Sequence, residues 1–284
     1  MKIANRMENL SPSVTLAITA LARELKAQGK DILSFSAGEP DFDTPQIVKD
    51  AAIKAINDGQ TKYTAVEGII ATKQAIINKL KKDHGLEYKL DGIVISNGAK
   101  HSLFNLFQVL IEKGDEVIIP APYWVTYPEQ VKFSDGIPVF IDTDDSTEFK
   151  ITPEQLKAVI TPKTKVLLLN TPSNPTGSVY TKEELTALGK VLEGTDILVF
   201  SDEMYEKIIY NGTKFTAAAE VSEDMYNRTV TINGLSKAVA MTGWRFGYIA
   251  TPNVALAKAL TKLQGQVTSN VNTMTQYAAI PALE

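Results

Sequence analysis

A lysine in an unusual setting is the first candidate for chemistry. Lys237 lies in the stretch N-G-L-S-K-A-V-A-M-T-G-W-R-F-G (233–247), where most neighbours are small or apolar and Arg245 follows. A surface lysine normally has polar neighbours. A lysine amine becomes nucleophilic when desolvation and a nearby cation lower its pKa. The stretch therefore predicts a partly buried amine with a chemical task.

An acidic and a phenolic side chain follow another apolar run. Asp202 comes directly after I-L-V-F-S (197–201), where an isolated carboxylate is costly to bury without a cationic partner. It either caps the turn that begins at Glu203 or pairs with a protonated ring nitrogen of a ligand. Tyr205 is close enough in sequence to reach the same ligand through its hydroxyl.

A candidate anion site lies at Gly98-Ala99-Lys100, between a predicted strand and a predicted helix. Free backbone N–H groups and the helix dipole attract phosphate at such a junction, although a single glycine also serves a plain tight turn. Ser236 and Arg245 add a hydroxyl and a guanidinium for the same anion. The alternative for Arg245 is an ordinary buried salt bridge.

Two further side chains fit either a structural or a ligand-binding role. Trp124 follows a Pro-Tyr pair, and it either packs in the core or offers a flat surface for an aromatic ring. Asn174, in S-N-P-T-G, either sets a turn or donates its side-chain N–H to a phenolic oxygen.

Several classes of protein are excluded by what the 284 residues lack. There is no G-x-G-x-x-G and no G-x-x-x-x-G-K-[ST], and His84 and His101 are the only histidines, so a triad or a metal centre is not expected. A net charge of −4 disfavours nucleic-acid binding. With no cysteine, no secretory signal and no membrane-spanning run, a cytoplasmic protein is expected.

The elements that must position these residues alternate along the chain. The predicted strands are Ile93–Ser96, Glu116–Ile119, Pro138–Ile141, Lys165–Leu169, Ile197–Ser201, Thr229–Ile232 and Gly247–Ala250. The predicted helices are Pro45–Asp58, Ile69–His84, Lys100–Glu112, Pro153–Ile160, Lys182–Leu192 and Val254–Gln264, with another begun near Asn272. Thr152 and Thr181 each open a capping box.

This alternation predicts an α/β fold with a mostly parallel seven-stranded sheet between helices. In such sheets, ligands bind at the carboxyl ends of the strands. Five predicted strand ends carry polar or aromatic groups: S-N-G-A-K (96–100), A-P-Y-W (121–124), N-T-P-S-N-P-T-G (170–177), S-D-E-M-Y (201–205) and N-G-L-S-K (233–237). We therefore expect one site along this edge.

Together these residues describe a site for pyridoxal 5′-phosphate, and the chain resembles the fold type I, class I aminotransferases. Within them it is most similar to the bacterial aspartate aminotransferase branch. The strings that carry the resemblance are S-A-G-E-P-D-F-D-T-P (36–45), K-Y-T (62–64), N-G-A-K (97–100), P-Y-W-V-T-Y-P (122–128), N-P-T-G (174–177), S-D-E-M-Y (201–205) and S-K-A-V-A-M-T-G-W-R-F-G (236–247).

The resemblance assigns roles around the cofactor ring. It implies that Lys237 forms the internal aldimine and later moves a proton between two carbons, and that Asp202 keeps the pyridine nitrogen protonated. Tyr205 and Asn174 would bind the phenolate oxygen, and Trp124 would stack on the ring.

The phosphate and the substrates have implied partners too. The phosphate would be held by Gly98, Ala99, Lys100, Ser236 and Arg245, and by Tyr63 of a second subunit in a homodimer. Gly38, Trp124 and Asn174 would contact the amino acid. Lys100 either approaches the distal carboxylate of aspartate or glutamate or is a solvated helix lysine. The implied reaction exchanges an amino group between L-aspartate, or a similar dicarboxylic amino acid, and 2-oxoglutarate.

The chain departs from the family pattern at its end, Pro281–Glu284. Family members continue through a smaller domain that carries an arginine for the substrate α-carboxylate. Residues 1–45 are expected to be the N-terminal part of that domain, and 46–284 the large cofactor-binding domain. The 284 residues alone are expected to transaminate poorly. The alternatives are an aromatic or prephenate-type aminotransferase and, for the shortened chain, a non-catalytic cofactor-binding domain.

Overall fold

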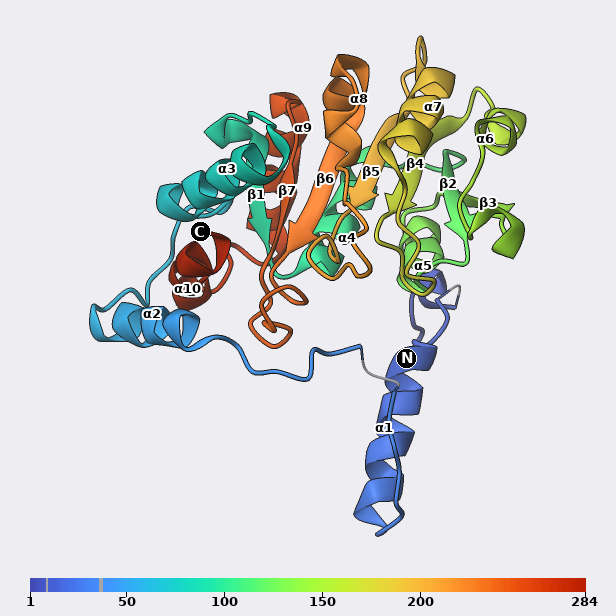
Figure 1. Ribbon diagram of the computed structural model, residues 1–284. Helices are drawn as coiled ribbons and strands as arrows, with labels where there is room; N and C mark the ends of the chain where they lie inside the picture. The colour runs from blue at the N-terminus through green and yellow to red at the C-terminus, as the bar shows by residue number, and fades with distance from the viewer. Residues whose placement is uncertain (9, 36–37) are drawn as a thin grey trace.

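The structure is a computed structural model that describes residues 1–8, 10–35 and 38–284. In these residues, seven strands form one sheet in the order β1-β7-β6-β5-β4-β2-β3 (Figure 1). All neighbouring strands run parallel except at β7, which is antiparallel to both β1 and β6. The mostly parallel sheet predicted from the sequence is therefore confirmed. The strands are β1 (Ile93–Ser96), β2 (Glu116–Ala121), β3 (Ile137–Asp142), β4 (Thr164–Asn170), β5 (Leu198–Asp202), β6 (Thr229–Gly234) and β7 (Gly247–Ala250).

The six bounded helix predictions are confirmed with ends shifted by no more than three residues, and a helix does begin after Asn272. The α-helices are α1 (Val14–Ala27), α2 (Gln46–Asn57), α3 (Ile70–His84), α4 (Ala99–Leu110), α5 (Thr126–Phe133), α6 (Pro153–Val159), α7 (Lys182–Leu192), α8 (Glu223–Arg228), α9 (Val254–Val267) and α10 (Thr273–Leu283). Short 3-10 helices are η1 (Asn5–Met7), η2 (Leu90–Gly92), η3 (Asp145–Thr147) and η4 (Ala218–Glu220).

Local sequence explains where several helices begin and why others were missed. Thr152 and Thr181 form the two predicted capping boxes, each accepting from the backbone N–H three residues on. The predictions omitted α1, α5 and α8. At eight and six residues, α5 and α8 are too short for a hydrophobic period to show, and α1 precedes the strand–helix alternation.

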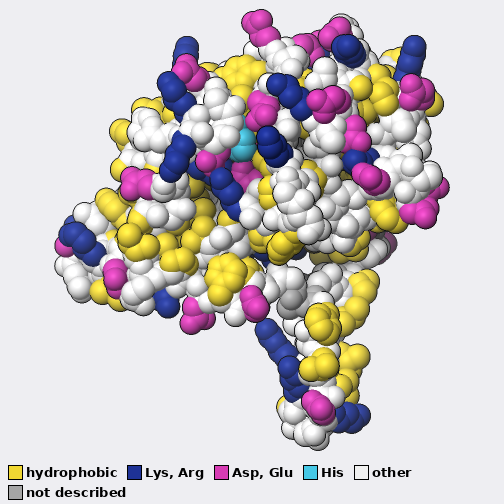
Figure 2. All heavy atoms as spheres, viewed as in Figure 1, with side chains coloured by type: hydrophobic (Ala, Val, Ile, Leu, Met, Phe, Trp, Pro, Cys, Tyr) yellow, Lys and Arg dark blue, Asp and Glu magenta, His cyan; other side chains and the backbone are white. Residues whose placement is uncertain are grey.

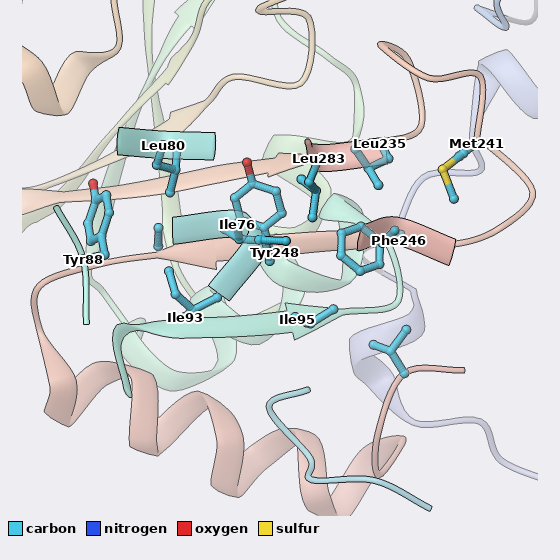
Figure 3. Packing of buried hydrophobic residues seen from close by; sticks show 14 of the residues in the cluster. Ile76, Leu80, Tyr88, Ile93, Ile95, Leu235, Met241, Phe246, Tyr248 and Leu283 are labelled. Carbon is cyan, nitrogen blue, oxygen red and sulfur yellow. The ribbon is translucent and has the colours of Figure 1, made fainter. Parts of the chain in front are cut away.

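The sheet is buried on both faces because successive strand residues point to opposite sides. In β2, Val117 and Ile119 pack with α4, α5 and α9, whereas Ile118 packs with α6 and α7 on the other side. On that second side, near β1 and β7, α3 supplies Ile76 and Leu80 (Figure 3). Two covered faces explain the almost entirely apolar strands, and they leave the strand ends as the place for polar chemistry.

The described residues of the N-terminal segment add no strand to the sheet. In Figure 1, α1 stands away from the sheet, and an extended stretch then leads to α2, which packs against α10. Leu33 and Phe35 in this segment are largely exposed. Among the described residues, no helix is both long and apolar enough to cross a bilayer.

Candidate active site

A cavity of ≈ 400 Å³ opens at the carboxyl ends of the central strands. Asn170 and Asp202, the last residues of β4 and β5, face each other in the sheet register and both line it. The cavity brings together ten of the residues predicted from the sequence: Gly38, Ala99, Lys100, Trp124, Asn174, Asp202, Tyr205, Ser236, Lys237 and Arg245. The expectation of a single site at this edge agrees with the geometry.

Two predicted residues do not line this cavity. Gly98 lies directly beside it, against the guanidinium group of Arg245. Tyr63 is 89% exposed and lies in the loop after α2. Its predicted contact is with the phosphate site of a second subunit, which a single chain does not contain. Ser36 and Ala37, the first letters of one quoted string, lie outside the described residues.

The Lys237 amine is partly buried and donates a hydrogen bond to the backbone oxygen of Gly38. Burial lowers the pKa of Lys237 and the nearby Arg245 guanidinium lowers it further, whereas the Glu39 carboxylate acts in the opposite direction. A lowered pKa increases the fraction of neutral amine, which is the nucleophilic form.

Residues 38–44 are held over the loop that carries Lys237. Thr242 donates to the Glu39 carboxylate at 2.7 Å, and the Trp244 indole donates to the Thr44 hydroxyl at 3.1 Å. The same Thr44 hydroxyl donates to the Ala240 carbonyl at 2.7 Å. These contacts join chain segments about two hundred residues apart, and Gly38, Glu39 and Thr242 line the cavity.

Asp202 is buried, with 4% of its surface exposed. The Tyr127 hydroxyl donates to one carboxylate oxygen at 2.7 Å, and the Met204 N–H donates to the other at 3.3 Å. Burial raises the pKa of Asp202 to about 6, although both hydrogen bonds favour the ionised form. By accepting from the Met204 N–H, the carboxylate caps the turn that follows β5. Asp202 also lines the cavity.

Tyr205 and Asn174 meet at the same cavity. The Asn174 side-chain N–H donates to the Tyr205 hydroxyl at 3.4 Å, and the Asn174 backbone N–H donates to the Asn170 side chain at 2.7 Å. Asn170 in turn donates to the Asp202 carbonyl at 3.0 Å. A short chain of hydrogen bonds therefore fixes Asn174 relative to the acid and the phenol.

The anion corner combines a helix N-terminus with a guanidinium group. Gly98 precedes α4 with φ +84°, and a Cβ there would lie 2.5 Å from a guanidinium nitrogen of Arg245. Glycine therefore allows the cation to approach the first N–H groups of α4, which have no intrahelical acceptor. Within the described part of the chain, no carboxylate lies at ion-pair distance from Arg245, so the salt-bridge alternative finds no support.

Trp124 and Lys100 form the outer part of the cavity. The Lys100 ammonium lies 4.7 Å from the Trp124 ring centroid, and the Tyr127 ring meets the indole edge-on at 5.3 Å. Burial lowers the pKa of Lys100, and the Arg245 charge adds to this effect. The indole is fixed by its neighbours and still lines the cavity.

Sequence reasoning missed several residues of the site. Tyr127 is the most important because it contacts both Asp202 and Trp124. Its position one helical turn after Trp124, inside P-Y-W-V-T-Y-P, was the available signal. Thr15, Thr19 and Arg23 of α1 also line the cavity. No local pattern could bring α1 to the end of a sheet that it does not join.

The residues present fit pyridoxal 5′-phosphate. The volume is within the range for small-ligand sites, roughly 300–1,000 Å³. The cavity offers an amine for an aldehyde, a buried acid for a ring nitrogen and an indole for a ring face. The corner at Gly98 and Arg245 offers N–H groups and a cation for a phosphate.

Comparisons with known proteins agree with this chemistry. The family described as "Aminotransferase class I and II" matches residues 30–284. An aspartate aminotransferase of Geobacillus stearothermophilus is 54% identical over 282 residues, which cover 99% of this chain and 72% of that protein. An "Aspartate/prephenate aminotransferase" of Nitrosomonas europaea is 52% identical over 284 residues, covering 100% of this chain and 71% of that protein.

A solved structure has the same fold. Aspartate aminotransferase from Thermus thermophilus with maleate superposes with a TM-score of 0.96 at 41% identity, and the match covers 100% of this chain and 73% of that one. Family match, sequence identity and fold therefore agree over nearly the whole chain. With the amine, acid and anion corner in one cavity, they establish that this chain belongs to the class I and II aminotransferases, in the aspartate aminotransferase branch.

Proposed function

We propose that this aminotransferase binds pyridoxal 5′-phosphate and transfers an amino group between L-aspartate, or a similar dicarboxylic amino acid, and 2-oxoglutarate. The observation that carries the proposal is the shared cavity of Lys237 and Asp202, an amine of lowered pKa and a buried acid. A pyridine aldehyde cofactor needs both groups, an amine to bond its aldehyde and an acid to pair with its ring nitrogen.

The chain's own residues have separate tasks. When bound, the cofactor supplies an electron-withdrawing ring that stabilises negative charge at the substrate α-carbon. Asp202 holds a proton on the ring nitrogen, and Tyr127 keeps the carboxylate oriented. Lys237 takes and returns the α-proton as general base and acid. Arg245 and the start of α4 hold the phosphate.

The preference for a dicarboxylic substrate rests on Lys100. Its ammonium group lines the cavity beside Trp124, where it can pair with a distal carboxylate. The Thermus thermophilus relative was solved with maleate, which is a dicarboxylate. The Nitrosomonas europaea relative supports a second candidate, because its name includes prephenate.

A spectrum of the purified protein tests the proposal. Addition of pyridoxal phosphate should give the visible absorbance of a lysine-bound cofactor, and L-aspartate should then convert it to the amine form. An aromatic preference would show as conversion by aromatic amino acids and little by aspartate, and a prephenate-type activity as return of the visible absorbance when prephenate is added to the amine form. A non-catalytic cofactor-binding domain would give the first change and never the second. If neither change occurs, the proposed function is wrong.

We also propose a homodimer in which Tyr63 reaches the partner's phosphate site. Tyr63 lies in the loop between α2 and α3, and both helices bear exposed apolar side chains. Figure 2 shows hydrophobic side chains gathered at the lower left of the molecule, where Figure 1 places α2. The exposed set is Ile47, Ile53, Ile56, Tyr63, Ile70 and Val267. An apolar patch of this kind is typical of a protein–protein interface.

Complementation between two impaired variants checks the dimer. Tyr63→Phe should weaken cofactor binding about tenfold, the effect of one lost hydrogen bond to a charged group. Lys237→Ala should remove the covalent bond. In a mixed dimer of these two variants, one site has both native groups, so part of the wild-type spectrum and affinity should return. A protein that sediments as a monomer, or mixtures that never recover, would contradict the proposal.

The division into residues 1–45 and 46–284 stays a prediction. It is supported by the exposed Leu33 and Phe35 and by the absence of any strand from the described residues of the first segment.

A further inference from the structure

The segment that carries Asp202 and Tyr205 has a second, buried side. Asp202, Met204 and Tyr205 line the cavity, whereas Glu203 and Glu206 do not. Both glutamates are nevertheless buried, at 0% and 5% exposure. Buried carboxylates need charged or hydrogen-bonding partners. Glu206 has charged partners on α3, behind the cavity. One Glu203 oxygen accepts from the Ser201 hydroxyl and from the Ala218 N–H of η4, and its other oxygen has no hydrogen-bond partner among the described residues.

His84, at the end of α3, is the centre of this buried cluster. One ring nitrogen lies 2.9 Å from a Glu206 oxygen and the other lies 3.4 Å from a Glu220 oxygen. Lys79 contacts the second Glu206 oxygen. A carboxylate at each ring nitrogen requires both nitrogens to donate, which only the imidazolium form can do. The His84 and Glu206 side chains are 7% and 4% exposed, so the ion pair is shielded from water.

A metal ion is the alternative occupant of this cluster. Ligand atoms of Asp83, His84 and Glu206 lie within 4.8 Å of one another. However, Lys79 lies 3.3 Å and Lys207 lies 2.8 Å from Asp83, and Lys79 also contacts Glu206. Two ammonium groups already neutralise both carboxylates, so the charges favour an ion-pair cluster over a cation site.

This cluster holds a stretch of chain that has little other support. Residues 203–217 contain neither helix nor strand. Glu203 is fixed by its backbone N–H, which donates to Ile232 at 2.9 Å, and by a side-chain oxygen that accepts from Ser201 at 2.7 Å. Beyond it, Met204 packs in the core, and Glu206 is held by His84 and Lys79. Tyr205 lies between these two residues.

We propose that His84, through its ion pair with Glu206, is a positioning residue that fixes the 202–206 segment and thereby sets the affinity of the site for its cofactor. This inference rests on the proposed function. His84 touches neither the cavity nor the cofactor site, so its effect is transmitted through the backbone of the segment that carries Asp202 and Tyr205.

The cluster should respond to alkaline pH. Burial alone would lower the pKa of His84, but hydrogen bonds to Glu206 and Glu220 raise it to about 9. Because the folded-state pKa is raised, the stabilisation is complete below the unfolded value of about 6.5 and is lost as pH rises through about 9. The charged or titratable groups around His84 are Glu203, Glu206, Glu220, Lys79, Asp83 and Lys207.

Deprotonation of Glu203 also lowers the stability of the folded protein as pH rises, but it does so at lower pH than deprotonation of His84. Burial and the neighbouring Glu206 charge raise the pKa of Glu203 to about 7. The folded state therefore favours its protonated form, and stability falls as pH rises from about 4.5 through about 7. The alkaline change near pH 9 is thus separable from the change due to Glu203.

Binding of pyridoxamine 5′-phosphate tests the proposal, because this probe forms no bond to Lys237. His84→Gln should raise its Kd about tenfold near neutral pH, since removing one partner of a buried pair disturbs the other. In wild type the Kd should rise above about pH 9. His84→Lys keeps the cation at that pH and should abolish the alkaline rise. It also keeps the proposal testable if His84→Gln does not fold.

Ile76→Val provides the matched control, since Ile76 is fully buried on the same helix and belongs to the hydrophobic core. It should lower the melting temperature of the apoprotein and leave the Kd unchanged. The proposal would be overturned if wild type and His84→Gln had equal Kd values. It would also be overturned if Ile76→Val lost as much affinity for pyridoxamine phosphate as His84→Gln does. If wild type binds no pyridoxamine phosphate, the proposed function itself fails and this inference falls with it.

Discussion

Replacing Lys237 by alanine should abolish the visible absorbance that pyridoxal phosphate acquires on binding and should lower transamination by at least about a thousandfold. Lys237 lines the cavity that fits the cofactor. In our proposal its amine both bonds to the cofactor and moves the substrate proton. Alanine removes both the bond and the base. Absorbance titration and single-turnover conversion of L-aspartate measure the two effects separately.

The control for this variant is Lys190→Ala, which removes an exposed lysine of α7 that does not line the cavity. It should bind the cofactor and turn over as wild type does. A Lys237→Ala protein that keeps the visible band would show that another amine bonds to the cofactor, and the assignment of Lys237 would then be wrong.

Asp202→Asn should stabilise the folded apoprotein but weaken its binding of the cofactor. Burial raises the pKa of Asp202 to about 6, so the folded apoprotein loses stability as pH rises from about 3.8 through about 6. A neutral amide removes that cost, and above this range the apoprotein should gain about 1–2 kcal/mol, or a few degrees of melting temperature. The amide cannot hold a proton on the ring nitrogen, so the cofactor Kd should rise at least about a hundredfold.

Melting curves of the apoprotein at several pH values and a cofactor titration check both parts. Asp224→Asn is a suitable control because Asp224 pairs with Arg228 on α8 and does not line the cavity. It should reduce stability slightly and leave the Kd unchanged. If Asp202→Asn weakens the apoprotein and spares cofactor binding, Asp202 is only a turn cap.

The predicted elements agree with the structure where the pattern is local. Strand residues such as Val117 and Ile118 are apolar in succession because both faces of a parallel sheet are covered, and that pattern is visible in the sequence. Helix starts at Thr152 and Thr181 depend on side chains three residues apart. The candidate amine and acid were also predictable, since each interrupts an apolar or small-residue run.

Other features depend on contacts between distant parts of the chain. Tyr127 and Asp202 are 75 residues apart in sequence and meet only because the fold brings the start of α5 to the end of β5. His84 and Glu206 are 122 residues apart and form one ion pair because α3 covers the sheet behind the site.

The sequence by itself therefore determined the alternation of the strands with most of the helices, the edge of the sheet that bears the candidate site and the main groups proposed to act there. Only the tertiary structure decided which buried side chains support the acid, where α1 lies and how the segment behind the site is anchored. The reason is physical. Hydrophobic periods and capping signals act over a few residues, whereas the partner of a buried charge is set by the packing of elements that the sequence does not place side by side.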